Sequence, residues 1–303
     1  MSLTSIITVN FNQAAVTIDM LRSVVQHTDR SSTEVILVDN GSIEDHEAAY
    51  RAACPGLIYI RSAKNLGFAG GNNLGIRAAT GDYLLLLNND TEITAGMVGQ
   101  LCREMEANPQ IGLLSPLILY YDAPGTVQYA GFTPMNYLTG RNSAIGYQEP
   151  DQGQYDQISR ETGYCHGAAM MCRRADLQQA GLMDEHYFLY YEELDWCEQF
   201  RRSGKKSWFT GHTKIYHKES VSVGRQSSIK TYFMTRNRMR FIRRNTGLLN
   251  TLLFSLFYIG IACPKQILHY LKDGRKDLIK WVIKGVQWNL THSKNSSVLG
   301  YKI

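Results

Sequence analysis

The residues best suited to chemistry lie in a few short clusters, and one cluster directly follows a run of four leucines. In "YLLLLNNDTE" the apolar run 84–87 leads directly into Asn88, Asn89 and Asp90. A hard divalent cation takes oxygen ligands and often uses only one or two carboxylates, with substrate phosphates completing its shell. Asp90 is therefore a candidate metal ligand. The same residues also suit an ordinary strand-to-loop turn, because Asn and Asp favour such positions.

A second cluster is acidic. The segment "EELD" holds Glu192, Glu193 and Asp195 within four residues. Crowded carboxylates raise one another's pKa, which can produce a general base. The alternative is a solvated helix start, where carboxylates interact favourably with the helix dipole. His217 ends the strand-like "KIYH" and could supply a neutral nitrogen ligand, although a histidine there is commonly an ordinary core or surface residue.

Two further segments are suited to contact with a nucleotide. Asp39 lies in "VDNGS" after an apolar run, where it could accept hydrogen bonds from a base or ribose, or simply cap a turn. The glycine-rich "NLGFAGGNNLG" would let the backbone approach a nucleotide closely. It matches neither the phosphate-binding loop of ATPases nor the dinucleotide-binding fingerprint, so ATP and NAD are not favoured.

An alternation of strands and helices positions these clusters. Apolar and β-branched runs predict strands at 5–11, 34–38, 56–62 and 82–90, with helical spacing between most of them. This order is typical of an α/β protein with a mostly parallel central sheet flanked by helices. Ligands of such sheets bind at the carboxyl ends of the strands. Polar residues follow three of the predicted strands, so we expect one polar site at that edge.

Taken together and in this order, the motifs resemble those of family-2 inverting glycosyltransferases, which have a GT-A (Rossmann-like) fold and a nucleotide-sugar donor. The succession "NLGFAGGNNLGI", "GDYLLLLNNDTE", "GAAMMCRR" and "GLMDEHYFLYYEELDWCEQFRRSG", followed by a histidine, is similar to the bacterial branch that includes rhamnosyltransferases and other surface-polysaccharide enzymes. The resemblance covers 5–224 outside 119–160. It implies transfer of a sugar from a UDP- or dTDP-sugar to a hydroxyl of a glycan or lipid-linked acceptor.

The resemblance also implies roles for single positions around the donor and the acceptor. Asp90 and His217 would bind a divalent cation, Mg²⁺ or Mn²⁺. Gly167 and Ala168 would border the acceptor. The residues expected to line the donor are Thr8, Asn10, Asp39, Asn65, Gly71, Asn88 and Asn89.

The catalytic base implied by the resemblance lies in the acidic cluster. The family's base is normally the aspartate of a Glu-Asp pair, and here the pair is Glu192-Glu193. Glu193 is therefore the favoured base, with Glu192 and Asp195 as alternatives. Such a base removes the proton of the acceptor hydroxyl while the nucleoside diphosphate leaves from the opposite face of the sugar.

Two regions differ from the rest in composition. Residues 119–160 are rich in Tyr, Gly, Asn and Gln with weak periodicity, which predicts a long surface excursion suited to a mobile substrate loop. Residues 226–303 hold 14 Lys and Arg against 2 Asp and Glu, a net charge of +12, whereas residues 1–225 hold 18 and 25, a net charge of −7. We therefore divide the chain into a catalytic domain, 1–225, and a basic helical extension, 226–303.

The extension also contains an uncharged apolar run, 245–264. Its length approaches the ~20 residues that span a bilayer, but cations flank it on both sides, from Arg236 to Arg244 and from Lys265 to Lys284. We expect helices that lie on an anionic membrane surface, with Trp281 and Trp288 among the lipid contacts. The alternatives are a helical subdomain that packs on the core, a homo-oligomer formed through these helices, and a single span.

The remaining features limit the location and the competing functions. Six scattered cysteines without a C-x-x-C pair, and an N-terminus that enters a strand-like run, predict a cytoplasmic protein without a signal peptide, peripheral at the inner face of the membrane. A sugar-1-phosphate nucleotidyltransferase would need a Gly- and Arg-containing loop near the N-terminus, which "TVNFNQAAVTID" lacks. A non-catalytic, membrane-attached sugar-nucleotide-binding protein stays open. No nucleic-acid partner is expected, because it would explain the basic extension but not the polar strand ends.

Overall fold

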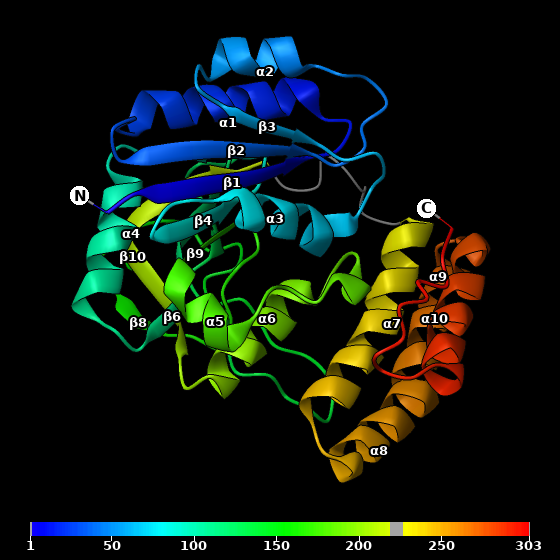
Figure 1. Cartoon of the computed structure of the whole chain (residues 1–303). Coiled ribbons are helices and arrows are strands. Elements are labelled where there is room, and N and C mark those ends of the chain that lie inside the picture. Colours follow the sequence, from blue (N-terminus) through cyan, green and yellow to red (C-terminus); the bar gives the residue numbers. More distant parts are fainter. Residues whose placement is uncertain (1, 219–226, 303) are drawn as a thin grey trace.

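The computed structural model describes residues 2–218 and 227–302. The expected domain boundary between residues 225 and 226 lies outside the described residues. A central sheet lies between layers of helices, and the C-terminal helices form a separate group beside this body (Figure 1).

The first part of the chain alternates strands and helices, as the sequence predicts. Its elements are β1 (Thr4–Asn10), α1 (Ala14–His27), β2 (Thr33–Asp39), α2 (Glu47–Ala53), β3 (Ile58–Arg61), α3 (Gly67–Ala78) and β4 (Tyr83–Leu87). β1 pairs in parallel with β2 on one side and with β4 on the other, and β2 pairs in parallel with β3. The polar residues that follow β1, β2 and β4 therefore reach one edge of the sheet.

The middle of the chain extends the sheet and adds antiparallel strands. Its elements are β5 (Thr91–Ile93), α4 (Met97–Ala107), β6 (Ile111–Tyr120), β7 (Val127–Tyr129), β8 (Ser159–Glu161), β9 (Ala169–Arg173), α5 (Leu177–Ala180), α6 (Glu192–Arg202) and β10 (Lys206–His217). The strand order is β3-β2-β1-β4-β9-β6-β10-β5, with β9 antiparallel to β4 and β6. The predicted α/β class is thus confirmed.

The apolar strands bury both of their faces, which explains why they read as continuous apolar runs. In β1, Ile6 belongs to the core that contains Leu21 of α1 and Leu101 of α4. Its neighbour Ile7 belongs to the opposite core, with Trp196 of α6. Successive side chains of a strand point to opposite faces, so this split follows directly from the strand geometry.

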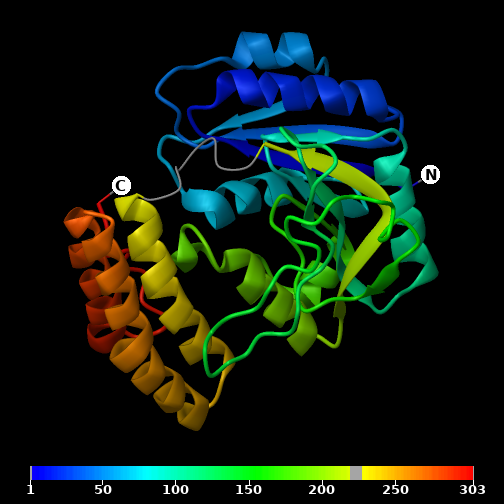
Figure 2. The ribbon, with the colours of Figure 1, turned by 180° about the vertical axis from the view of Figure 1, so that it is seen from behind.

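The 119–160 excursion is anchored in the core at its first part. β7 pairs with β6, and Val127, Tyr129 and Ala130 are fully buried. The sequence missed this short strand because three residues carry no useful periodicity. Further along, the excursion runs over the face seen in Figure 2, with Leu138 and Tyr147 half exposed.

The C-terminal helices are α7 (Ser228–Asn245), α8 (Leu248–Phe257), α9 (Cys263–Lys272) and α10 (Ile279–Thr291). They gather on one side of the body, with α7 facing α6 in both views (Figures 1 and 2). A π-helical segment joins α8 to α9, so 248–272 form one helix of 25 residues. By length and composition this helix could cross a membrane. Only 17% of its 18-residue apolar stretch is buried inside the protein. The predicted helical extension is therefore present.

Part of the expected membrane-facing set is instead buried inside the protein. Arg236 and Arg240 have no exposed surface, and Trp288 is 3% exposed. Both guanidinium groups lie over the Trp288 ring, at 4.7 and 5.8 Å from its centroid. These three residues hold α7 and α10 together through cation–π contacts, so the expectation that they meet lipid is wrong.

Candidate active site

The ends of β1 and β2 are joined by a network of buried polar side chains. The amide of Asn10 donates to Oδ2 of Asp39 (3.2 Å) and to Oγ of Ser42 (3.0 Å). The backbone N–H of Ser42 donates to the other Asp39 oxygen (2.8 Å). Asn10 and Asp39 have no exposed surface. A cavity of about 340 Å³ opens beside Asn10 and Ser42, with Asn12 and His46 also in its lining.

The predicted donor residues differ in how they lie relative to this network. The Thr8 hydroxyl is buried without a hydrogen bond to any residue that the structure describes. Asn65 accepts a hydrogen bond from the amide of Asn40 (3.1 Å), a residue that directly follows Asp39. Gly71 packs on the sheet, since a Cβ there would lie 2.7 Å from Cγ1 of Val9. Its small size is thus accounted for by the packing of α3 on β1.

The residues after β4 continue the edge. The amide of Asn89 donates to the Thr17 hydroxyl (2.9 Å), which itself donates to Oδ1 of Asn10 (3.0 Å). The backbone N–H of Asn88 donates to the carbonyl of Ala168 (2.9 Å). Asn88 and Asn89 therefore connect the Asn10–Asp39 network to Ala168, one of the predicted acceptor residues.

Asp90 and His217 meet although 127 positions separate them. Nε2 of His217 lies 3.1 Å from Oδ1 of Asp90. That oxygen is buried. Among residues 2–218 and 227–302 it has no partner that meets the geometry of a hydrogen bond. Nδ1 of His217 lies 2.9 Å from Oε1 of Gln128 in β7. Because a carboxamide oxygen can only accept, Nδ1 donates to Gln128, and Nε2 is the ring atom that faces Asp90.

This arrangement fits a divalent cation. Oδ1 of Asp90 and Nε2 of His217 face each other at 3.1 Å, and both atoms are suitable ligands for a cation that would lie against them. The described residues contain no group of three His, Cys, Asp or Glu side chains able to hold a metal. A cation bound here would therefore take its remaining ligands from the donor diphosphate or from water.

His166 is a polar residue of this site that the sequence did not single out. Nδ1 of His166 accepts from the backbone N–H of Ala168 (3.1 Å), and its ring lies edge-on to His217 at 5.9 Å. Burial, reinforced by His217, lowers the pKa of His166 to about 3, so the ring is neutral near pH 7. The sequence feature that could have identified His166 is its position next to Gly167 in "CHGAA".

The acidic pair lies at the start of α6. Burial raises the pKa of Glu193, and burial together with the Glu193 carboxylate raises the pKa of Glu192 well above its usual range. Glu192 is 3% exposed, and its Oε2 makes no hydrogen bond in the described part of the chain. A Cβ on Gly167 would lie 3.8 Å from Cγ of Glu193. Glu193 thus borders the predicted acceptor residues.

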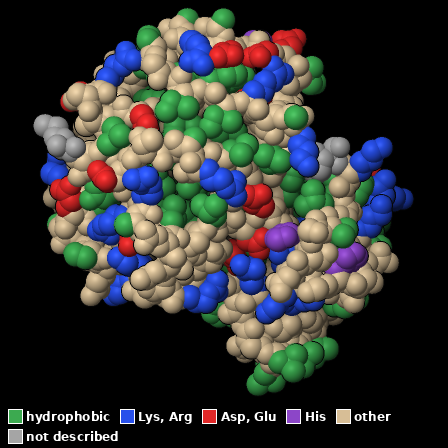
Figure 3. All heavy atoms as spheres, in the orientation of Figure 1, with side chains coloured by type: hydrophobic (Ala, Val, Ile, Leu, Met, Phe, Trp, Pro, Cys, Tyr) green, Lys and Arg blue, Asp and Glu red, His purple; other side chains and the backbone are tan. Residues whose placement is uncertain are grey.

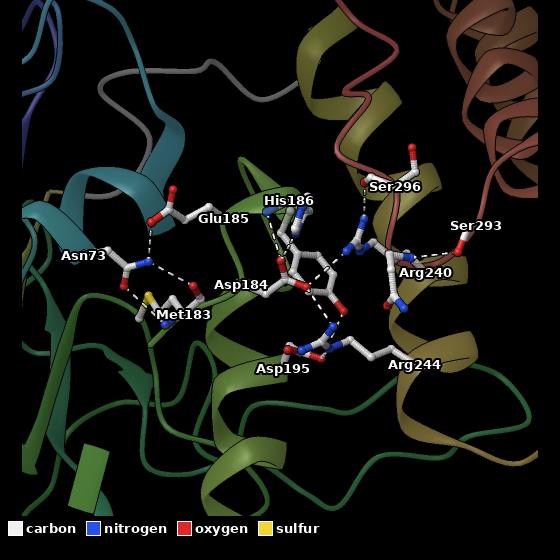
Figure 4. Close-up of polar contacts among 12 residues, drawn as sticks. Asn73, Met183, Asp184, Glu185, His186, Asp195, Arg240, Arg244, Ser293 and Ser296 are labelled. Atoms are coloured by element: carbon white, nitrogen blue, oxygen red, sulfur yellow. Dashed lines mark hydrogen bonds and ion pairs between the residues drawn. The ribbon is translucent and has the colours of Figure 1, made fainter. Parts of the chain in front are cut away.

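Asp195 faces the other way. It accepts hydrogen bonds from Tyr187 (3.1 Å) and Asn245 (2.8 Å), and it pairs with Arg244 at 3.1 Å. In Figure 4, Arg244 reaches from α7 to both Asp195 and Asp184. The structure thus places Asp195 in the contact between α6 and α7, apart from Gly167 and Glu193.

A larger cavity, of about 1010 Å³, lies between the 182–188 loop and the C-terminal tail. Its lining includes Asn65, Asp184, Phe188 and Arg244. The Asp184 carboxylate already binds His186 and the α7 arginines (Figure 4). The polar groups of this wall therefore serve largely to attach α7.

Comparison with known proteins agrees with this geometry. The family described as glycosyl transferase family 2 matches residues 5–181. The low-salt glycan biosynthesis hexosyltransferase Agl10 of Haloferax volcanii is 29% identical over 68% of this chain and 66% of its own length. The N-acetylglucosaminyl-diphospho-decaprenol L-rhamnosyltransferase of Mycobacterium tuberculosis is 26% identical over 68% of this chain and 72% of its own length. The chain thus spans about two thirds of the length of these relatives.

Two solved structures share the fold. GalNAc-T7 with UDP, GalNAc and Mn²⁺ superposes with a TM-score of 0.66 at 16% identity, over 96% of this chain and 57% of that one. The mannosyltransferase PcManGT of Pyrobaculum calidifontis with GDP-Man and Mn²⁺ gives 0.59 at 12% identity, over 96% and 87%. The fold is therefore GT-A, and the chain is a glycosyltransferase that belongs to glycosyl transferase family 2.

Proposed function

We propose that the protein is an inverting glycosyltransferase that moves a sugar from a UDP- or dTDP-sugar to a hydroxyl of a glycan or lipid-linked acceptor in cell-surface polysaccharide synthesis. The observation that carries the proposal is the single polar edge. It runs from the buried Asn10–Asp39 network through Asn88 and Ala168 to Gly167 and Glu193. The similarity to a hexosyltransferase and a rhamnosyltransferase supports the class of donor and acceptor.

The donor nucleotide would lie at the ends of β1 and β2. Asp39, held by Asn10 and Ser42, would accept hydrogen bonds from the base or the ribose. The cavity beside Asn10 gives room for part of the nucleotide. Asn65 would bound the same side, since Asn40 ties it to the end of β2.

Asp90 and His217 would hold a divalent cation, Mg²⁺ or Mn²⁺, against the donor diphosphate. When bound, the cation neutralises the negative charge that develops on the leaving diphosphate. By accepting a hydrogen bond from Nδ1–H of His217, Gln128 would orient the imidazole so that Nε2 faces the cation. Asn88 and Asn89, which carry no charge, would bind ribose, phosphate or water next to it.

Glu193 would act as the general base. Burial raises its pKa above the usual range of a glutamate, which makes it a stronger base, and Glu193 lies against Gly167. Glu192, buried and with a more strongly raised pKa, would remain protonated and would not compete for the proton. Asp195 would have a structural role, because Arg244, Asn245 and Tyr187 all contact its Oδ1. The amide of Gln199 donates to its Oδ2 (2.9 Å).

The test compares Glu193→Gln with Glu106→Gln, which changes an exposed glutamate of α4. Turnover is followed as nucleoside diphosphate release from a panel of UDP- and dTDP-sugars with Mn²⁺, and donor binding as the thermal shift that a tight ligand produces. Since general-base help is worth about 10²–10⁴ in rate, Glu193→Gln should lose at least about 100-fold in turnover and keep the shift. Glu106→Gln should match the wild type.

Turnover within tenfold of wild type for Glu193→Gln would remove Glu193 as the base. Donor binding without turnover in the wild type would favour the non-catalytic alternative.

We also propose that the extension holds the enzyme at the inner face of the membrane. The helix 248–272 exposes leucines and isoleucines along much of its length, and the segment after it carries exposed lysines. Figure 3 shows apolar side chains gathered at the projecting end of the extension. Apolar side chains flanked by cations bind anionic lipid surfaces. Such attachment would suit a lipid-linked acceptor.

A further inference from the structure

The backbone just before the acidic pair is strained. Phe188 has φ 65° and ψ −56°, and the N–H of Leu189 donates to the carbonyl of Tyr187 (2.8 Å). This is a γ-turn of the rare form with positive φ. Tyr190 and Tyr191 follow with φ of 69° and 75°. Aromatic residues rarely adopt these values, so the surrounding structure must hold them.

The strained segment directly precedes the proposed base. Tyr191 is the residue before the first turn of α6, and Glu192 and Glu193 are the first two helical residues. The Tyr191 side chain makes no capping hydrogen bond to the helix. If the turn relaxed, the direction from which the chain enters α6 would change, and the Glu193 carboxylate would move away from Gly167.

One side chain of α7 contacts most of the strained turn. The amide nitrogen of Asn237 lies at hydrogen-bond distance from the carbonyl oxygens of Tyr187 (3.0 Å), Leu189 (2.8 Å) and Tyr190 (2.8 Å). Asn237 has no exposed surface. Three acceptors around one NH₂ group fix the orientation of the carboxamide, because its oxygen would be repelled there. In turn, the amide favours the conformation in which these carbonyls converge.

Neighbouring residues of α7 hold both sides of the same turn. The ring of Phe233 stacks on Phe188, with centroids 5.1 Å apart. Nε of Arg238 donates to the Tyr191 hydroxyl (2.8 Å). Further along α7, Arg240 and Arg244 bind Asp184, as Figure 4 shows.

We propose that α7 is a positioning element of the active site and that Asn237 is its central positioning residue, which holds the 187–191 turn so that Glu193 faces the acceptor. The catalytic consequence rests on the proposed function, in which Glu193 is the base. The contact of Asn237 with the turn does not depend on that function. The extension would then belong to the catalytic machinery as well as to the membrane attachment, and a displacement of α7 would reach Glu193 through the 187–191 turn.

The test compares Asn237→Ala with Asn289→Ala. Asn289 is also buried and donates to two carbonyls, those of Arg236 (2.9 Å) and Gly285 (3.0 Å), but it joins α7 to α10 and lies outside the turn. Both variants lose side-chain hydrogen bonds to backbone, so both should lower Tm. Hydrogen exchange of the 187–193 amides, kcat and donor affinity separate them.

For Asn237→Ala we expect exchange of the 187–193 amides to rise at least tenfold and kcat to fall about 10- to 100-fold, because a displacement of about 1 Å can cost that much. Donor affinity should stay within about twofold. Asn289→Ala should keep kcat and 187–193 exchange within about twofold of the wild type. Should Asn237→Ala not fold, Asn237→Ser keeps one donor and should show a smaller change of the same kind.

Two results bear on the proposal in opposite directions. Unchanged 187–193 exchange in both Asn237 variants, or a kcat loss equal to that of Asn289→Ala, would overturn it. If Glu193→Gln keeps its activity while Asn237→Ala still loosens 187–193, the hold of α7 on the turn is supported and the assignment of the base fails.

Discussion

At the scale of single residues, the site contains two neighbouring carboxyl groups whose pKa values are both raised by burial. Glu192 is nearly inaccessible, and burial and the Glu193 carboxylate raise its pKa. A carboxyl group whose pKa is higher in the folded than in the unfolded state stabilises the protein below the unfolded pKa, near 4.5, and loses this contribution as the pH rises through the folded value.

The raised pKa of Glu192 predicts how Glu192→Gln changes the pH dependence of stability. The glutamine cannot ionise, so its Tm should fall less than that of the wild type as the pH rises from 4 to 9. The measurement is a thermal unfolding series over that pH range. Glu106→Gln should follow the wild-type curve. Parallel curves for Glu192→Gln and the wild type would show that Glu192 is not held protonated by the fold.

A second prediction at this scale concerns Gln128, whose amide oxygen lies 2.9 Å from Nδ1 of His217. Gln128→Ala should weaken Mn²⁺ binding about 10- to 100-fold, as loss of the partner of a metal-binding histidine typically does. Calorimetric titration of Mn²⁺ in the presence of UDP measures this. Gln287→Ala, on the exposed face of α10, is the control and should not change the affinity. Equal affinities in both variants would contradict the role of Gln128.

At the scale of elements, the contact between α3 and the 187–191 turn depends on one glycine. Gly67 has φ +74°, and a Cβ there would lie 2.1 Å from the carbonyl oxygen of Phe188. The neighbouring Phe68 N–H donates to the same oxygen (2.7 Å). Both the backbone conformation and the lack of space thus require glycine at the start of α3.

Gly67→Ala should therefore destabilise the protein by about 2 kcal/mol or more, since positive φ in a non-glycine residue already costs about 1–3 kcal/mol. Urea unfolding gives the free energy of unfolding. The matched substitution is Gly99→Ala in α4, where φ is helical and the nearest atom, Nη1 of Arg103, lies 3.5 Å from the new Cβ. That variant should gain up to about 1 kcal/mol. A loss of equal size in both variants would show that the contact with Phe188 adds nothing.

At the scale of the whole molecule, the extension has an inward and an outward side. Arg236 and Arg240 point inward and hold the body, whereas Leu248, Leu252 and Leu256 are 77%, 53% and 72% exposed. The first set belongs to the fold. The exposed leucines bury little surface within the protein and are suited to contact with a membrane or another subunit.

We expect the protein to float with vesicles that contain anionic lipid at low salt, and less so at high salt, because the cationic contribution is screened. Replacing Leu248, Leu252 and Leu256 by Ser should reduce the floating fraction several-fold. Ile43→Ser, an equally exposed site on the body, should not. If the wild type stays with the buffer and the serine variant instead changes from dimer to monomer in sedimentation, these leucines form a subunit interface.

The sequence by itself determined the alternation of strands and helices in the first part of the chain, from β1 to β4, and the polar edge. Apolar runs and turn residues specify these locally, and parallel strands bring their carboxyl ends together. Only the tertiary structure separated Asp195 from Glu193. Two residues along a helix lie about 200° apart around its axis, so they face opposite sides. It also decided the partners of His217 and of the strained turn, because Gln128 and Asn237 come from distant segments without a local pattern that would pair them.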